Sequence, residues 1–521
     1  MKNKSNFLLL SAFVGGLLFS FLFWEERLAI NLCIYSIFLL TITWLNPDVT
    51  KTTKFKFYGM AHLLAAILVV INNSDLTLVS YYISLMLFIG FSHNQQLRTV
   101  FTSLLSTVLQ MLTIPFNAIR NLSEVTVGNF NLKPVFRLIK YVFIPVLIII
   151  VFSSLYAAAN SVFAHYTEQV LVSIGDVFDA IFGFIFKDLS FPRFIHFCFG
   201  LIVTGGLIIT FSDKALQNFE LKFKEQLFRI RNNSNQKTIW FELAKTFSGN
   251  LLIRKLALKT EFITALLSFT ALNLLLLLLN IIDITTLWFG QKPSGNFSAE
   301  LHDGTNTLIF SIILAMAIII YFFRANLNFY SKSKVLRMLA FAWMFQNALL
   351  IISVLIRDGY YIEFHGLTHK RIGVLVFALL CAIGLSTVYL KVVRQKTFFY
   401  LLKINGNTWF ALLLAFSVIN WDVFIVKYNL SHADSISIDT TYLLSLSDKT
   451  LPFIDKNKDK LLATPVFIPK GEVIIDPTND QLINRLDQRI NFFKERYEKS
   501  GWLSWNLQDW NTAEYFNLNK K

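Results

Sequence analysis

The chain is built from apolar blocks of about 17 to 22 residues, which short charged loops separate. A helix of this length crosses a hydrocarbon layer about 30 Å thick. The sequence therefore predicts an all-α polytopic membrane helical bundle. We expect eleven spans, at residues 7–24, 28–45, 56–72, 76–92, 138–158, 194–212, 262–282, 306–323, 336–356, 372–391 and 407–426.

The composition favours a membrane protein over two other classes. Charged residues make up 16% of the 521 residues, whereas soluble domains carry about 25%. This all but excludes a water-soluble multidomain enzyme. The 53 phenylalanines exclude intrinsic disorder. Three cysteines are too few for a disulfide framework or a zinc site, and we expect neither a metal nor a cofactor.

Basic residues are concentrated on alternating loops of this topology. Such loops face the cytoplasm, so the net charge of +15 is a topology signal, and no nucleic-acid partner is expected. The N-terminus is then cytoplasmic, and everything after residue 426 is extracytoplasmic. This fits a multi-pass membrane protein, with the lipid bilayer as a partner. The loops assigned to the cytoplasm are 46–55, 93–137, 213–261, 324–335 and 391–406.

Two further apolar segments leave the number of spans open. Residues 97–116 are interrupted by Gln110, and residues 170–186 contain Asp176 and Asp179. One additional crossing would invert every later loop and break the charge pattern. Both segments therefore cross or neither does, and we expect that neither does.

This topology divides the chain into four regions. They are an N-terminal four-span region with an inside loop (1–137), two spans with a basic loop (138–260), a five-span region (261–426) and a small extracytoplasmic tail domain, mainly helical (427–521).

Two helices outside the spans are predicted from amphipathic patterns. In the basic loop, residues 213–231 are expected to lie on an anionic lipid surface. In the tail, Thr478 and Gln481 resemble a capping box that starts a helix ending near Lys499. The apolar face of the first comprises Phe219, Phe223, Leu227 and Ile230, and that of the second Leu482, Leu486, Ile490, Phe493 and Tyr497.

The sequence contains no phosphate-binding loop, nucleophile elbow or dinucleotide-binding motif. Polar side chains inside spans are then the main pointers to function, because their burial in lipid is costly. Hydrogen bonding between helices is their simplest role, and lining a transport path is the alternative. The intramembrane polar candidates are His62, Gln346 and Asn347, together with Asn273 and Asn280.

A second group of candidates lies at the predicted outer ends of the last four spans. Such a cluster either binds an anionic headgroup or small polar ligand, or forms an ion-pair belt that docks the tail. A shared helix face for His365 and His369 would suit a metal, but Gly366 between them argues against it. The cluster comprises His302, Asp303, Arg357, Asp358, His365, His369, Arg371 and Asp422.

Several short motifs, in order, resemble the bacterial multi-pass membrane proteins grouped as domain of unknown function 4153/4173. The specific part covers roughly residues 260–510. The resemblance implies an integral cytoplasmic-membrane protein of unassigned activity and supplies no catalytic residues. The motifs are Leu301–Gly304, Tyr321–Arg324, Gln346-Asn347, Tyr360-Tyr361, Gly366–Val374, Asn420–Asp422, Lys427–Leu430, Tyr442–Ser447 and Trp505-Asn506.

Three functions remain open from the sequence. The favoured one is a binding, scaffold or signalling protein that presents the outer polar patch and the tail to an envelope partner. The alternatives are a small-molecule or lipid transporter and, third, a membrane-embedded transferase. A polar vestibule reaching Gln346 favours transport, whereas a filled interior favours partner binding.

Overall fold

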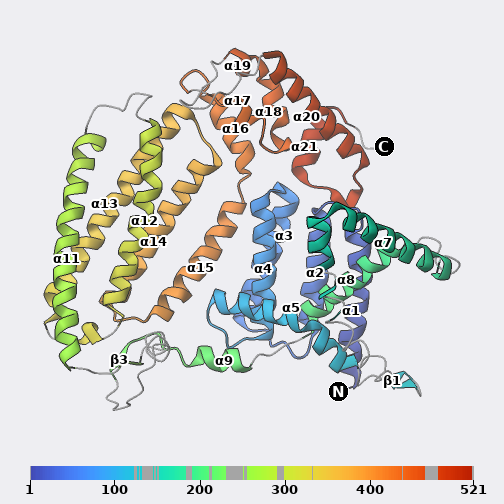
Figure 1. Cartoon of the computed structure of the whole chain (residues 1–521), viewed down its shortest axis with the longest axis horizontal. Helices are drawn as coiled ribbons and strands as arrows, with labels where there is room; N and C mark the ends of the chain where they lie inside the picture. The colour runs from blue at the N-terminus through green and yellow to red at the C-terminus, as the bar shows by residue number, and fades with distance from the viewer. Residues whose placement is uncertain are drawn as a thin grey trace. The chain divides into compact units, whose positions relative to one another are not determined.

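The computed structural model is helical, and its described strands are four two-residue segments (Figure 1). The strands are β1 (Thr126–Val127), β2 (Phe130–Asn131), β3 (Phe228–Arg229) and β4 (Asn250–Leu251); β1 pairs antiparallel with β2, and β3 parallel with β4. The described residues are 2–122, 126–127, 130–131, 145, 148–149, 152–182, 190–209, 214–229, 250–251, 255–289, 298–324, 326–330, 332–436, 438–463 and 479–518.

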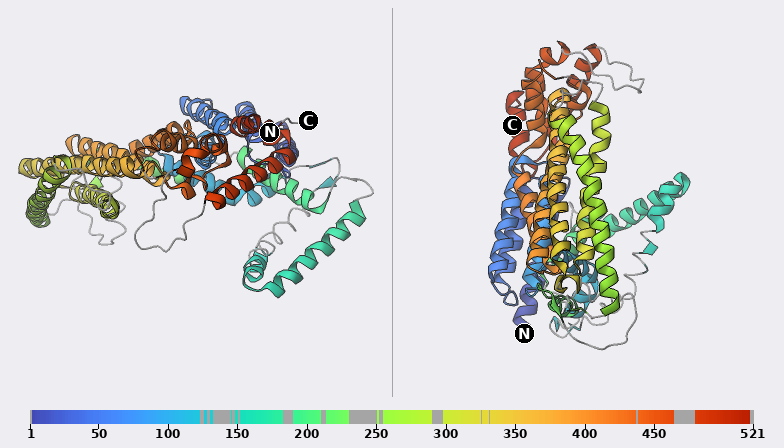
Figure 2. Two further views of the ribbon diagram at one scale, coloured as in Figure 1. Left: turned by 90° about the horizontal axis from the view of Figure 1, so that it is seen from above. Right: turned by 90° about the vertical axis from the view of Figure 1, so that its left-hand side faces the viewer.

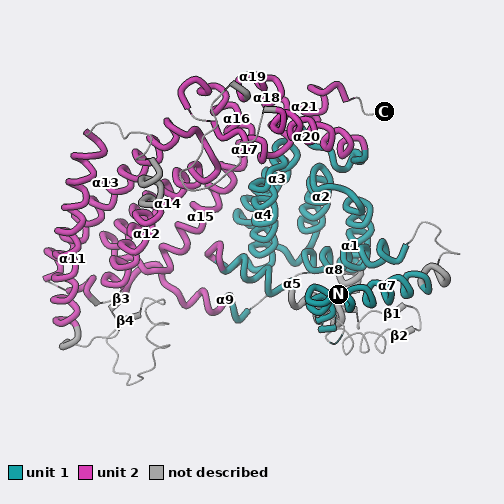
Figure 3. The backbone as a smooth tube through the Cα atoms, turned by 45° about the horizontal axis from the view of Figure 1, so that its top comes forward, with its two compact units in different colours: residues 1–97, 102–217, 499–507 teal, residues 98–101, 218–498, 508–521 magenta. Residues whose placement is uncertain are grey.

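The helices fall into two compact units (Figure 3). Unit 1 comprises residues 1–97, 102–217 and 499–507, and unit 2 comprises residues 98–101, 218–498 and 508–521. The helices of unit 1 are α1 (Lys2–Phe23), α2 (Ile30–Leu45), α3 (Thr53–Asn72), α4 (Asp75–His93), most of α5 (Val100–Leu122), α7 (Ser161–Phe182), α8 (Phe191–Ile208) and the start of α9 (Lys214–Leu221).

Close packing of α1 against α8 depends on glycine. A Cβ atom added at Gly16 would lie 3.0 Å from the Cα of Leu201, and one added at Gly200 would lie 2.6 Å from the ring of Phe19. Small residues allow this approach of two backbones, as in other membrane helix pairs.

Helix α5 packs its polar side chains against α4 and the residue that follows α4. Thr107 donates to the carbonyl of Met86 at 2.7 Å, and the amide of Asn94 donates to Ser106 at 2.7 Å. On the other side, Leu105 is exposed. This arrangement leaves an apolar face outward. That residues 97–116 do not cross the membrane stays a prediction.

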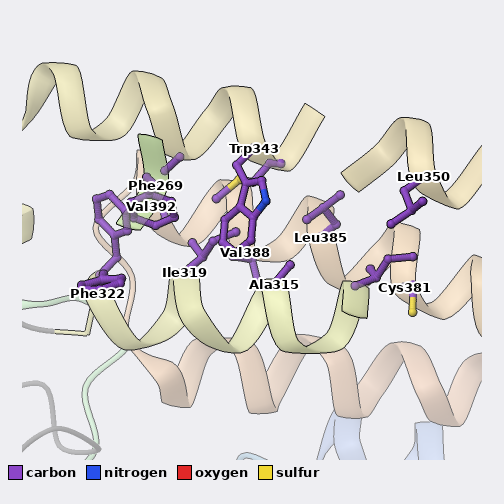
Figure 4. Close-up of a cluster of buried hydrophobic side chains, with 14 of the residues drawn as sticks. Phe269, Ala315, Ile319, Phe322, Trp343, Leu350, Cys381, Leu385, Val388 and Val392 are labelled. Carbon is purple, nitrogen blue, oxygen red and sulfur yellow. The ribbon is translucent and has the colours of Figure 1, made fainter. Parts of the chain in front are cut away.

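Unit 2 contains the longest apolar helices. They are α11 (Lys255–Asp283), continued by a π-helical turn η1 (Ile284–Trp288), then α12 (Ser298–Phe322), the short η3 (Asn326–Phe329), α13 (Ser333–His365), α14 (His369–Val393), α15 (Phe398–Ser417) and α16 (Trp421–Ser431). Helices α11 and α12 both pack on α13, which packs on α14 (Figure 2). Buried Phe269, Trp343 and Leu385 belong to the core between them (Figure 4).

Six described helices are long and apolar enough to cross a membrane, or seven if the bent pair α15 and α16 counts as one span. The six are α3, α4, α8, α11 with η1, α13 and α14, and each coincides with a predicted span. The predicted span 407–426 contains a break, because α15 and α16 meet at 59°. About half of the predicted span 138–158 lies outside the described residues.

The tail forms a second apolar core in unit 2. Its elements are α17 (Thr440–Leu443), η4 (Asp448–Thr450), α18 (Leu451–Lys456), α19 (Lys458–Ala463), α20 (Asn479–Lys499) and α21 (Leu507–Tyr515), while η5 (Trp502–Ser504) belongs to unit 1. The predicted apolar stripe of α20 is confirmed, because all five of its side chains are buried in this core. Trp502 and Trp510 are exposed.

The amphipathic helix predicted over residues 213–231 is shorter than expected. Helix α9 ends at Leu221, and beyond it Gln226 forms a β-bridge with Lys396. Phe223 and Leu227 turn inward, whereas Phe219 is exposed, so these side chains do not share one face. Ile230 lies outside the described residues.

Candidate functional site

The outer cluster is carried by an extension of α13. This helix continues past the predicted end of its span at residue 356 to His365, and α14 begins at His369. Gly366 lies between them with φ of 72°, a left-handed conformation that favours glycine. The turn is fastened to α16, because Asn429 accepts from the Leu367 amide at 2.6 Å and donates to its carbonyl at 2.9 Å.

Arg357 pairs with a residue that the sequence analysis missed. Its guanidinium donates to Asp283 Oδ1 at 2.5 Å, and the two side chains are only 18% and 2% exposed. Asp283 is the last residue of α11, directly before the π-helical turn. The available signal was an acidic residue that immediately follows a long apolar run, on the predicted side of the membrane that is short of cations.

His369 links three helices. Its Nε2 atom lies 2.9 Å from Asp422 Oδ1 on α16, and its Nδ1 atom lies 3.0 Å from the hydroxyl of Tyr442 on α17. Asp422 also accepts from the Ser447 amide at 3.1 Å. Burial raises the pKa of Tyr442, so its hydroxyl remains a donor at neutral pH. With Nε2 donating to Asp422, Nδ1 can accept from Tyr442.

Arg371 caps the end of α13. It donates to the carbonyl of His365 at 2.8 Å and to that of Gly366, and its guanidinium lies 4.3 Å from the ring centroid of Tyr361. A cation at a helix C-terminus is stabilised by the unpaired carbonyls there. Asp358 on α13 is buried, and its Oδ2 has no hydrogen-bond partner among the described residues.

Three predicted members of the outer cluster remain, namely His302, Asp303 and His365. The backbones of His302 and Asp303 belong to α12, but their side chains lie outside the described residues. His365 ends α13 and packs its ring on Tyr361, whereas His369 starts α14. The two histidines therefore do not share a helix face. Within the described part of the chain, no group of three His, Cys, Asp or Glu side chains has the geometry to hold a metal.

The intramembrane candidates form hydrogen bonds either between helices or within one helix. The side chain of Gln346 on α13 donates to Asn273 on α11 at 2.8 Å, and the backbone carbonyl of Gln346 accepts from Asn280 at 3.2 Å. Asn347 donates to the carbonyl of Trp343 at 2.8 Å. In unit 1, fully buried His62 bonds through Nδ1 to Ser84 at 3.0 Å. The bonds of Gln346 and His62 join neighbouring helices, whereas the bond of Asn347 stays within α13.

Comparison with known families gives one match. The model of the family described as "Domain of unknown function (DUF4153)" matches residues 58–457. The match begins well before residue 260, where the resemblance was expected to become specific, and ends before α20. The match contains every member of the outer cluster, from His302 to Asp422, and also their partners Asp283 and Tyr442. No curated protein and no solved structure matches the chain.

Proposed function

The chain belongs to the family of domain of unknown function DUF4153, and we propose that it is a multi-pass protein of the bacterial cytoplasmic membrane that presents a folded tail to an envelope partner. On this proposal the outer cluster fastens the tail to the membrane helices. The tail surface, and not the interior of the bundle, is the functional part.

The core that the tail shares with the membrane helices carries this proposal. Leu367 in the turn before α14, Ile372 on α14 and Ile425 on α16 are buried in one cluster. The same cluster contains Leu443 and Phe493 of the tail. A domain built on a common core with its anchor keeps a fixed position, because burial of apolar surface resists its detachment. Fixed presentation suits recognition by a partner.

The proposed topology has eleven spans, with the N-terminus inside and the tail outside. Besides the six long helices and the bent pair, the shorter apolar helices in α1, α2 and α12 coincide with predicted spans. Reporter fusions test this orientation. A reporter active only outside the cytoplasm should work after Lys521 and fail after Lys334, in a predicted cytoplasmic loop. The reverse pattern overturns the orientation and with it an exterior tail.

Partner binding is tested by site-specific photo-crosslinking in intact cells. A crosslinker at exposed Trp510 or Tyr515 on α21 should give a discrete protein adduct. The same group at exposed Leu274 on α11 should give none, because that position is proposed to face lipid. Absence of a tail adduct under several growth conditions contradicts the proposal.

Transport of a small molecule or lipid is the second candidate function. The buried Oδ2 of Asp358 without a partner among the described residues favours it, because such a group suits a ligand or proton. The contacts of Gln346 with Asn273 count against a path at that depth. Substitution of Arg371 or Asp422 should abolish flux or lipid binding if this candidate is correct. A membrane-embedded transferase ranks third, since no observed spacing favours it.

A further inference from the structure

The segment 218–228 is held on the turn between α14 and α15. The amide of Thr397 donates to the carbonyl of Glu225 at 3.1 Å, and its hydroxyl donates to the carbonyl of Lys224 at 2.6 Å. Because the backbone is fixed at these points, the side chains of the segment have defined inward and outward directions.

The inward side of this segment is acidic and aromatic. The ring of Phe223 stacks on Phe399, with centroids 5.6 Å apart and planes at 13°. The carboxylate of Glu225 lies 2.7 Å from Lys403 Nζ and 2.6 Å from Arg98. These contacts join the segment to α15 and to Arg98, which lies just before α5.

The other acidic residue of the segment also faces the protein. Glu220 is buried and accepts from the backbone amide of Arg98 at 3.0 Å. Glu220 and Glu225 are the only acidic residues between positions 218 and 228. The outward side therefore carries no carboxylate.

The outward side combines apolar and basic side chains. Phe219, Leu221 and Phe228 are 55%, 51% and 46% exposed. Lys222 and Lys224 are exposed beside them, and the Lys224 ammonium lies 4.8 Å from the ring centroid of Phe228. Large apolar side chains flanked by lysines are typical of elements that bind at the boundary of headgroups and acyl chains.

We propose that the outward face of residues 218–228 binds the surface of a bilayer that contains anionic lipids. The two lysines complement phosphate headgroups, and the three apolar side chains insert beneath them. Position supports this partner, since α15 begins at Phe398, directly after Thr397, and belongs to a membrane-capable helix pair. The inference goes beyond the proposed role of the tail and holds for either orientation of the chain.

Lipid quenching in nanodiscs tests the proposal on the full chain. A nitrobenzoxadiazole label is placed at Phe219→Cys after the three native cysteines are replaced by Ala, and size-exclusion chromatography checks folding. Acyl-chain doxyl lipid should quench the label in discs of phosphatidylcholine and phosphatidylglycerol. Lys222→Gln with Lys224→Gln should lower the ratio of inserted to detached segment about 25-fold, since each lysine contributes about fivefold near an anionic surface.

A matched variant controls for net charge. Lys456→Gln with Lys458→Gln removes two exposed tail lysines and should leave the quenching unchanged. A label at position 219 that aqueous iodide quenches and doxyl lipid does not overturns the proposal. Shielding from both quenchers also overturns it, because a protein then covers the face. Equal insertion in discs of phosphatidylcholine alone overturns the anionic requirement.

Discussion

The imidazole of His369, at the first residue of α14, lies 2.9 Å from the carboxylate of Asp422 on α16. The same ring reaches the hydroxyl of Tyr442 in the tail at 3.0 Å. One side chain therefore couples α14, the helix α16 that begins within the last predicted span, and the tail. It supplements the shared apolar core with directional bonds.

His369→Phe should loosen the tail without unfolding the membrane helices. The substitution removes both hydrogen bonds of the imidazole. We expect the local stability of the tail to fall by about 1 to 2 kcal/mol, since the site is partly exposed. Hydrogen exchange should rise in α17 and remain unchanged in α13. Lys370→Gln, at the adjacent exposed position, is the control. Equal protection of α17 in wild type and His369→Phe would show that the apolar core alone holds it.

Breaking the Asp283–Arg357 pair should destabilise the outer ends of α11 and α13. Arg357→Leu leaves a nearly buried carboxylate without its cation, and such a loss typically costs about 3 to 5 kcal/mol. The double variant with Asp283→Leu should recover most of this, because no uncompensated charge remains. Thermal unfolding in detergent measures both. A double variant no more stable than Arg357→Leu contradicts the electrostatic explanation.

The positions of the six long apolar helices could be predicted because each apolar block is about as long as a helix that crosses lipid. The break after α15 was missed, because residues 407–426 are apolar throughout most of their length. Asn420 nevertheless accepts from the Val423 amide at 3.3 Å and starts a new helix. The pair Asn420 and Asp422, a cap followed by an acid in the first turn, was the available signal.

The helix 213–231 was overextended for a different reason. Phe219, Phe223 and Leu227 recur every four residues, which fits one face of a helix but also the alternation of an extended chain. Only tertiary contacts with Phe399 and Thr397 decide between them, and these are remote in sequence.

The members of the outer cluster could be predicted, but their pairing could not. Arg357 was assigned no particular acid, and Asp283 was omitted because it lies at the end of a different span. Contacts between helix ends depend on which helices are neighbours and on where each one stops. Because α13 continues to His365, several charged side chains lie on an extension of this helix. Hydrophobicity alone does not predict that extension.

Gly16→Val should disrupt the packing of α1 on α8. The new Cβ would lie 3.0 Å from the Cα of Leu201, a backbone atom that cannot rotate away. Overpacking of this kind costs about 1 to 3 kcal/mol, and the variant should unfold at lower temperature. Gly175→Val on α7 is the matched control, since a Cβ there meets nothing within 4 Å. Similar unfolding temperatures for both variants would contradict close helix contact at Gly16.

Acid should release the segment 218–228 from the α14–α15 turn. Hydrogen bonding to Lys403, with a further contribution from Arg98, lowers the pKa of Glu225 below its ordinary value of 4.5. Because the pKa of Glu225 is lower in the folded state, its carboxylate fully stabilises attachment of the segment to the turn above pH 4.5. This stabilisation is lost as the pH falls through the folded-state pKa. A spin label at Gln226→Cys, an exposed position, should therefore become more mobile on acidification. Glu225→Gln should raise its mobility at neutral pH and abolish that pH dependence, because the titrating group is gone. A label whose mobility changes equally with pH in both proteins assigns the transition to another group.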